Sequence, residues 1–186
     1  TEILTAPPLD AATVVMLRDA QTGLQVLLMR RHQASNVLGG VYVFPGGKLD
    51  AADQDPAWLP RLSQDSATLH QRLNEPGLPN ERAAGLFVAA MREAYEECRV
   101  LLGRSQADAQ ETGDLQLALR NGQSWHEAFQ SRALQLRTDL LVPWSRWITP
   151  QQASVTNKRF DTRFFVTQVP DDQFAEHDNH EATEVV

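Results

Sequence analysis

Cysteine is nearly absent from this chain, because Cys98 is the only one among 186 residues. A single cysteine cannot form an intramolecular disulfide, so the fold must be held by a hydrophobic core, and a cytoplasmic location is the simplest expectation. The chain also lacks any apolar stretch as long as a signal-peptide core or a membrane span. We therefore expect no membrane partner.

Positive charge is also in short supply. The sequence has 17 basic and 24 acidic residues, which gives a formal net charge of −7. A protein that binds nucleic acid broadly needs a basic surface against the phosphates, so we expect no nucleic-acid partner. Any site for a phosphorylated ligand must be local.

Several common catalytic motifs are missing too. The sequence contains no Walker loop, no GxGxxG run and no GxSxG nucleophile elbow. Cys98 falls on the apolar side of its expected helix, where a thiol is inert. What remains is the length and the 42% hydrophobic content, which fit one α/β domain over residues 1–186. The first residue is not methionine and the last residues, EATEVV, predict a strand, so we expect the natural ends to be missing, at the carboxyl end especially.

The run Arg92 to Cys98 (REAYEEC) is the most unusual feature that is present. At 3.6 residues per turn, Glu93, Glu96 and Glu97 fall within about 100° of one another, and Glu93 and Glu97 lie about 6 Å apart along the axis. Carboxylates this close repel each other unless a cation lies between them, and oxygen ligands suit Mg²⁺ or Mn²⁺. The simpler interpretation is a solvated helix face. An apolar stripe on the opposite side comprises Phe87, Met91, Ala94, Tyr95 and Cys98.

Two glycines upstream of this helix favour a site. Residues Val41 to Phe44 predict a strand that runs into Pro45, Gly46 and Gly47. Glycine permits a sharp turn and a close approach of the backbone to a ligand. Together with the glutamates, these residues resemble the signature of the Nudix hydrolases, in which Gly47 and Asp53 would be the first pair and Arg92, Glu93, Glu96 and Glu97 the second part.

The resemblance has two departures. The spacer between Asp53 and Arg92 is 38 residues, much longer than usual, so an insertion over about residues 54–80 splits the signature. The family's glycine after the helix is Arg99 here. Either Arg99 adopts a left-handed backbone at about 1 kcal/mol, or the helix continues to Gly103. The insertion is either a lid or a packed surface elaboration.

The split signature resembles a long-insertion Nudix branch that includes coenzyme A and acyl-coenzyme A diphosphatases. The strings LLMRRH, VFPGGKLDAAD and RFDTRFF carry this resemblance, which runs from about Thr13 to the end. It implies a Nudix-fold α/β/α sandwich with a mixed sheet, extra helices at about 105–137, and metal-dependent cleavage of a diphosphate in a nucleotide derivative. The alternative is a regulatory Nudix domain that binds such a ligand without hydrolysing it.

The resemblance also implies residue roles. Glu93, Glu96 and Glu97 would hold Mg²⁺ or Mn²⁺, Arg92 would orient a glutamate, and the Gly46 or Gly47 region would offer a backbone carbonyl to the metal. Glu93 is the first choice for the general base, with Glu181 or Glu184 as alternatives. Candidate phosphate contacts are Arg30, Arg31 and Arg159.

Coenzyme A or its acyl esters rank first among substrates, ahead of ADP-ribose and nucleoside triphosphates. The coenzyme A signature of a shorter-box branch is absent, since the corresponding positions are Met29, Arg31, His32 and Asn36.

The remaining pattern predicts further elements. A hairpin should join Ala12 to Leu17 with Leu24 to Met29, ended by two arginines that either face a phosphate or solvate an edge. Helices are expected over Glu81 to Val100, with Asn80 as N-cap, over Leu59 to Leu73, over Asp114 to Arg120, and from a Ser124–Glu127 capping box to about Leu136. The last two helices narrow the cleft, form a dimer surface or serve only as scaffold, and the scaffold interpretation is the simplest, so a homodimer remains an open alternative.

Strands are expected over Leu141 to Ile148 and over Phe160 to Val169. The first of them carries Trp144 and Trp147. Tryptophans of this kind are more typical of a core or an interface than of a base-stacking platform.

Overall fold

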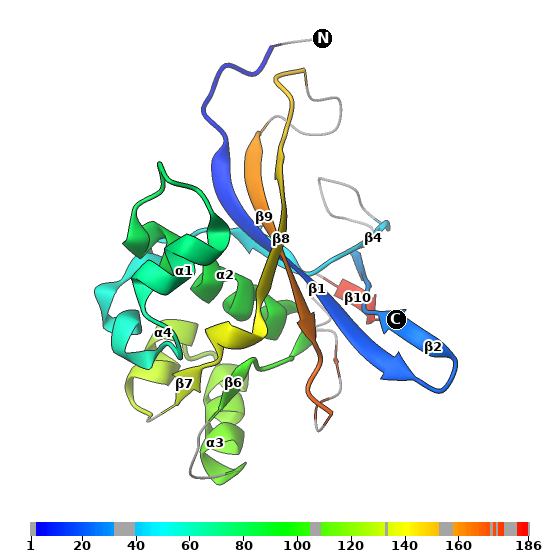
Figure 1. Ribbon diagram of the computed structural model, residues 1–186. Helices are drawn as coiled ribbons and strands as arrows, with labels where there is room; N and C mark the ends of the chain where they lie inside the picture. Colours follow the sequence, from blue (N-terminus) through cyan, green and yellow to red (C-terminus); the bar gives the residue numbers. More distant parts are fainter. Residues whose placement is uncertain are drawn as a thin grey trace.

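The computed structural model describes residues 3–31, 40–104, 109–132, 134–152, 158–171, 173, 175–176 and 182–185. A mixed five-stranded sheet forms its centre, in the order β2-β1-β9-β8 with β5 added to β1 (Figure 1). β1 runs parallel to β9, and the other pairs are antiparallel. The strands are β1 Leu9–Ala20, β2 Gly23–Val26, β5 Gly46–Lys48, β8 Val142–Ile148 and β9 Phe160–Gln168.

The predicted hairpin is confirmed in its first half. β1 and β2 pair antiparallel with Ala20 opposite Gly23, and Gly23 has a φ of +112°, which suits glycine at the turn. The prediction that the second strand continues to Met29 is wrong. The chain leaves the sheet after Val26 and forms β3 (Met29–Arg31) in another sheet, so Arg30 and Arg31 lie within a strand. An apolar run does not tell one strand from two that belong to different sheets.

The second sheet has the order β10-β3-β4 and lies on the opposite side of β1 from α1, α2 and α4 (Figure 1). β4 is Tyr42–Val43, and β10 is Ala182–Val185, which confirms the terminal strand. A third sheet pairs β6 (Gly103–Arg104) with β7 (Gln135–Leu136).

The helix α2 (Asn80–Cys98) is the central helix. It begins one residue earlier than expected, because the carbonyl of Pro79 accepts the first helical hydrogen bond from the N–H of Ala83, so Pro79 and not Asn80 is the N-cap. It ends at Cys98, and the next residue, Arg99, caps it with a left-handed φ of 60° and an N–H that donates to the Tyr95 carbonyl. The left-handed alternative is therefore correct, and the helix stops short of Gly103.

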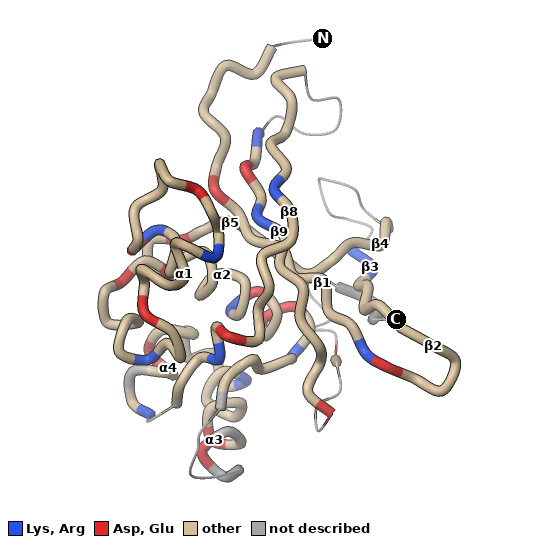
Figure 2. Tube along the Cα trace, viewed as in Figure 1, with Lys and Arg blue, Asp and Glu red and all other residues tan. Residues whose placement is uncertain are grey.

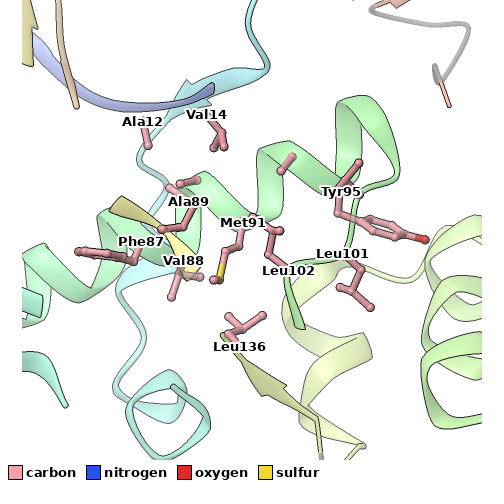
Figure 3. Close-up of a cluster of buried hydrophobic side chains, with 14 of the residues drawn as sticks. Ala12, Val14, Phe87, Val88, Ala89, Met91, Tyr95, Leu101, Leu102 and Leu136 are labelled. Carbon is pink, nitrogen blue, oxygen red and sulfur yellow. The ribbon is translucent and has the colours of Figure 1, made fainter. Parts of the chain in front are cut away.

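The hydrophobic core lies between α2 and the sheet, as Figure 3 shows for Ala12 and Val14 of β1 above the helix. Phe87 of α2 and Phe165 of β9 are fully buried with ring centroids 4.8 Å apart. The predicted apolar stripe is confirmed, since each of its members is buried. The stripe and its partners fix the rotation of α2 about its axis, which turns the glutamates away from the core.

The insertion between Asp53 and α2 packs on the outside of α2. It follows η1 (Ala51–Gln54), which includes Asp53, and contains η2 (Pro56–Arg61) and α1 (Ser66–Leu73). The expected helix from Leu59 is wrong at its start, because α1 begins only after Asp65, whose carboxylate accepts the Thr68 N–H at 2.8 Å. Side chains from all parts of the insertion are buried, namely Trp58, Leu62 and Leu69.

Two further helices follow, α3 (Ala109–Arg120) and α4 (Trp125–Gln130), and a short η3 (Thr138–Leu140) precedes β8. The capping box of Ser124 and Glu127 is confirmed. The expectation that this helix reaches Leu136 is wrong, because residues 135–136 pair with β6 instead. None of the helices in the ranges given above is long and apolar enough to cross a bilayer.

The strand β8 forms an edge of the main sheet and carries both exposed tryptophans. The side chains of Trp144 and Trp147 are 67% and 61% exposed, so of the two predicted locations the core is wrong and the interface stays a prediction. Acidic and basic residues are interspersed along the described trace (Figure 2).

Candidate active site

A cleft of about 530 Å³ opens where β5 meets the carboxyl-terminal half of α2. Its walls come from β1, β3, β5, β9 and α2, so the main sheet, the second sheet and the helix all contribute. The insertion contributes no lining residue, which makes it a packed elaboration and not a lid in this structure. The lining residues are Ala11, Thr13, Arg31, Gly46, Gly47, Lys48, Arg92, Glu93, Glu96, Glu97, Phe160 and Thr162.

Asp53 and Arg92, which lie on either side of the insertion in the sequence, are in direct contact. Arg92 donates from Nε and Nη2 to the two carboxylate oxygens of Asp53, at 2.8 and 2.9 Å. Asp53 is only 2% exposed, and it also accepts the N–H of Asp50 at 2.9 Å. A bidentate pair of this kind fixes the plane of the guanidinium. The chain of 38 residues between Asp53 and Arg92 therefore folds back so that these two side chains still pair.

The other edge of Arg92 orients two glutamates. Its Nη1 donates to Glu93 Oε1 at 2.7 Å and to Glu96 Oε2 at 2.8 Å, and Nη2 donates to the Lys48 carbonyl at 3.1 Å. Burial alone would lower the pKa of Arg92, but its hydrogen bond with Asp53 and the charge of Glu93 outweigh burial and raise that pKa above its usual value. The cation between the carboxylates in this structure is thus an arginine.

Glu93 lies against β5. Burial raises the pKa of Glu93 to about 7, although Arg92 opposes this effect, and burial likewise raises the pKa of Glu96. A Cβ atom placed on Gly47 would overlap the Glu93 carboxylate, so a larger residue at this position would have to displace that side chain. The backbone here lies close to a carboxylate of the protein itself, and the expected close approach to a ligand stays a prediction.

Glu97 is held on the neighbouring glycine. Its side chain accepts the Gly46 N–H at 2.7 Å, and the residue is only 4% exposed. The expected sharp turn at the glycines is wrong, because neither has a positive φ and both pair with β1 as part of β5. The absence of side chains on this strand, and not a turn, brings the helix and the backbone together.

The donor set fits a hard divalent cation. Three carboxylates and a strand backbone offer only oxygen ligands, as Mg²⁺ and Mn²⁺ prefer. In the described ranges, no three His, Cys, Asp or Glu side chains already converge on one point. Since Glu93 and Glu96 are both bound to Arg92, a cation would have to draw them partly away from the guanidinium.

The three predicted phosphate contacts lie in different places. Arg31 lines the cleft. Arg30 instead donates to the Gly40 carbonyl at 3.2 Å, and its guanidinium lies 5.9 Å from the centre of the Tyr42 ring. Arg159 donates to the carbonyls of Thr149 and Ala6, at 2.9 and 3.4 Å, away from the lining.

Other predicted residues are outside the described part. Glu181, His32 and Asn36 are among them, and for Glu184 only the backbone is described, opposite Arg30 in the β10–β3 pair. Sequence reasoning did not single out Lys48, Phe160 and Thr162, although all three line the cleft. They do lie within two of the three strings that carry the family resemblance, Lys48 directly after Gly47, and Phe160 and Thr162 shortly after Arg159.

Known proteins resemble the chain over most of its length. Two curated relatives are named acyl-coenzyme A diphosphatase NUDT19. The one from Homo sapiens is 30% identical and covers 77% of this chain and 48% of its own, and the one from Xenopus laevis is 26% identical and covers 86% and 51%. This chain therefore spans about half the length of these relatives.

The solved structures support the same fold. A NUDIX hydrolase from Alicyclobacillus acidocaldarius matches with a TM-score of 0.70 and 24% identity, covering 98% of this chain and 79% of its own. The α/β fold with a mixed sheet and packed helices is thereby confirmed. The family model described as the NUDT19 Nudix domain matches residues 64–186, about two thirds of the chain. The chain belongs to the NUDT19 Nudix domain family.

Proposed function

We propose that this chain is a metal-dependent hydrolase that cleaves the diphosphate linkage of a nucleoside diphosphate derivative. The observation that carries the proposal is the convergence of Glu93, Glu96 and Glu97 with Arg92 in the wall of one cleft. A structural helix face has no need of three carboxylates beside glycines that leave room for them. The names of the curated relatives support the same reaction class.

The three glutamates would hold Mg²⁺ or Mn²⁺, with a backbone carbonyl of Gly46 or Gly47 as a further ligand. The bound cation supplies neutralisation of the charge that grows on the attacking and leaving oxygens. Arg92 acts as a positioning residue, since its bonds to Asp53 fix it and its bonds to Glu93 and Glu96 orient those side chains. The Gly46 N–H orients Glu97 in the same way.

The attacking water must lose a proton to a carboxylate. Glu93 remains the first choice for this general base because it lines the cleft beside the Gly47 backbone. Glu181 and Glu184 remain the alternatives. Replacing Glu181 or Glu184 by glutamine separates them. If one of these two is the base, its replacement should lower turnover while leaving manganese affinity nearly unchanged, whereas if Glu93 is the base, both replacements should leave turnover near the wild-type value.

The substrate ranking follows from the basic groups and the relatives. Arg31 and Lys48 both line the cleft and are the best-placed contacts for phosphate oxygens, whereas Arg159 is engaged elsewhere. We rank coenzyme A and its acyl esters first, in accord with the relatives' names, ADP-ribose second, and nucleoside triphosphates third.

A panel assay tests the function. These compounds are incubated with manganese or magnesium, and the products are identified by mass. Release of 3′,5′-ADP and a phosphopantetheine from coenzyme A would support the ranking. Fast cleavage of ADP-ribose with coenzyme A untouched would overturn it.

A second candidate is a domain that binds the nucleotide without hydrolysing it. Two observations favour it. Arg99 stands at the left-handed position where the family has glycine, and Arg92 already forms salt bridges with Glu93 and Glu96. Such a domain would bind ADP-ribose or coenzyme A with metal present and release no product over a long incubation.

A further inference from the structure

Trp147 lies beside the cleft, on the same face of the sheet as the strand residues that line the cleft. In the β8–β9 pair, Trp147 is directly opposite Thr162, and Thr162 lines the cleft. Residues directly opposite each other in antiparallel strands point to the same face, with Cβ atoms about 5 Å apart. Phe160, two residues before Thr162 on the same face of β9, is also in the lining. Two aromatic rings therefore flank one threonine at this border.

The opposite face of these strands carries an ionic cluster. Arg146 and Arg163 are opposite each other in the register, one residue along from Trp147 and Thr162. Both arginines bind Glu75 of the insertion, so they face the helical side of the sheet. Because side chains alternate along a strand, Trp147 projects to the other side, with 61% of its surface exposed.

We propose that Trp147, together with Phe160, forms the platform on which the adenine base of the nucleotide stacks. The inference rests on the proposed function, because it assigns the base end of the same ligand whose diphosphate would lie at the glutamates. A large aromatic ring left exposed at the rim of a polar cleft suits a planar ligand, since stacking requires a free ring face. Lys48 and Arg31 line the same cleft, where the phosphates would lie.

Trp144 provides a matched control. It is the same residue type on the same strand and is 67% exposed. It lies at the irregularity between Pro143 and Ser145, and their partners Phe165 and Phe164 are not in the cleft lining. A general effect of removing an exposed tryptophan from β8 would therefore appear in both variants, whereas loss of base stacking would appear only at Trp147.

The experiment measures by calorimetry the affinity of the full chain for ADP and for inorganic pyrophosphate, each with magnesium. The change Trp147→Ala should weaken ADP binding by about 5- to 100-fold and leave pyrophosphate binding unchanged. Trp147→Phe should keep most of the ADP affinity, and Trp144→Ala should bind both probes like the wild type. Thermal melts check that each variant is folded.

Any of three results would overturn the platform. The first is an unchanged ADP affinity in Trp147→Ala, the second is an equal loss of ADP affinity in Trp144→Ala, and the third is a wild type that does not bind ADP. A shift from dimer to monomer in sedimentation with ADP affinity intact would assign Trp147 to an interface instead. Hydrolysis is measured separately, so a wild type that binds ADP through Trp147 but cleaves no diphosphate would reject the proposed function and keep the platform.

Discussion

At the scale of single residues, a change at Glu97 should impair catalysis without impairing folding. The change Glu97→Gln keeps an oxygen that can accept the Gly46 N–H and removes a charge four residues from Glu93. Without metal, we expect the melting temperature to hold or rise, and turnover with metal to fall by about two or more orders of magnitude.

The matched control is Glu81→Gln, on an exposed position in the first turn of the same helix. It should leave both quantities unchanged. Hydrolysis near the wild-type rate in Glu97→Gln would reject the role of this carboxylate as a metal ligand.

Arg99 tests the backbone at the end of α2. Its φ of 60° is unfavourable for a side chain with a Cβ, so Arg99→Gly should raise the free energy of unfolding by up to about 1 kcal/mol. The lost contact of the guanidinium with the Tyr95 ring, 5.5 Å away, offsets part of this gain. Asn74→Gly, at the second left-handed position with a φ of 54°, should gain less because asparagine tolerates this backbone. A clear loss of stability in Arg99→Gly would contradict the account.

The raised pKa of Glu93 should make the stability of the metal-free protein depend on pH. Its pKa of about 7 lies above the usual 4.5, so the folded state binds this proton more tightly than the unfolded state does. The group therefore lowers stability progressively as pH rises from about 4.5 to 7, by at most about 3 kcal/mol, and no further above that. Urea unfolding in EDTA at pH 5 and pH 7.5 should show a smaller decrease for Glu93→Gln. Identical pH dependence in both proteins would refute this.

At the scale of elements, a buried ionic cluster joins the insertion to the sheet. Arg163 of β9 is 3% exposed and donates to Glu75 at 2.9 and 2.7 Å, and it also binds Asp10 of β1. Arg163→Ala removes the most buried cation of the cluster and leaves Glu75 and Asp10 paired only with the more exposed Arg146 and Arg82, so unfolding in urea should show a loss of about 3 kcal/mol. Arg18→Ala, which removes an exposed hydrogen bond to Gln25, should cost less than about 1 kcal/mol. A loss of similar size in both variants would argue against a stabilising role for this ionic cluster.

Local signals predict some elements well and others poorly. The helix α2 was predictable because its start residues, apolar stripe and acidic face agree over 19 residues. The break between β2 and β3 and the strand conformation of Gly46 and Gly47 were not, because both depend on pairing with distant strands.

The site shows the same division. Glu93, Glu96 and Glu97 are neighbours on a helix, so their grouping follows from the sequence. Lys48, Phe160 and Thr162 reach the cleft only through the sheet register, which no local pattern specifies.

At the scale of the whole molecule, the sheet and α2 bring one short glycine strand and one helix face together. Residues as far apart in the sequence as Ala11 and Thr162 thus line one cleft, while the insertion packs on the outside of α2. Arg92 holds Glu93 and Glu96, and the Gly46 backbone holds Glu97, so the arrangement of the carboxylates depends on the complete fold.

The most direct test is a titration of the full chain with manganese and with magnesium after removal of metal by EDTA, following the products from coenzyme A by mass. The account predicts no cleavage in EDTA, and a rate that rises with either cation and saturates as 3′,5′-ADP and phosphopantetheine appear. Undiminished cleavage in EDTA would contradict it, as would the absence of cleavage of every diphosphate in the panel at saturating metal.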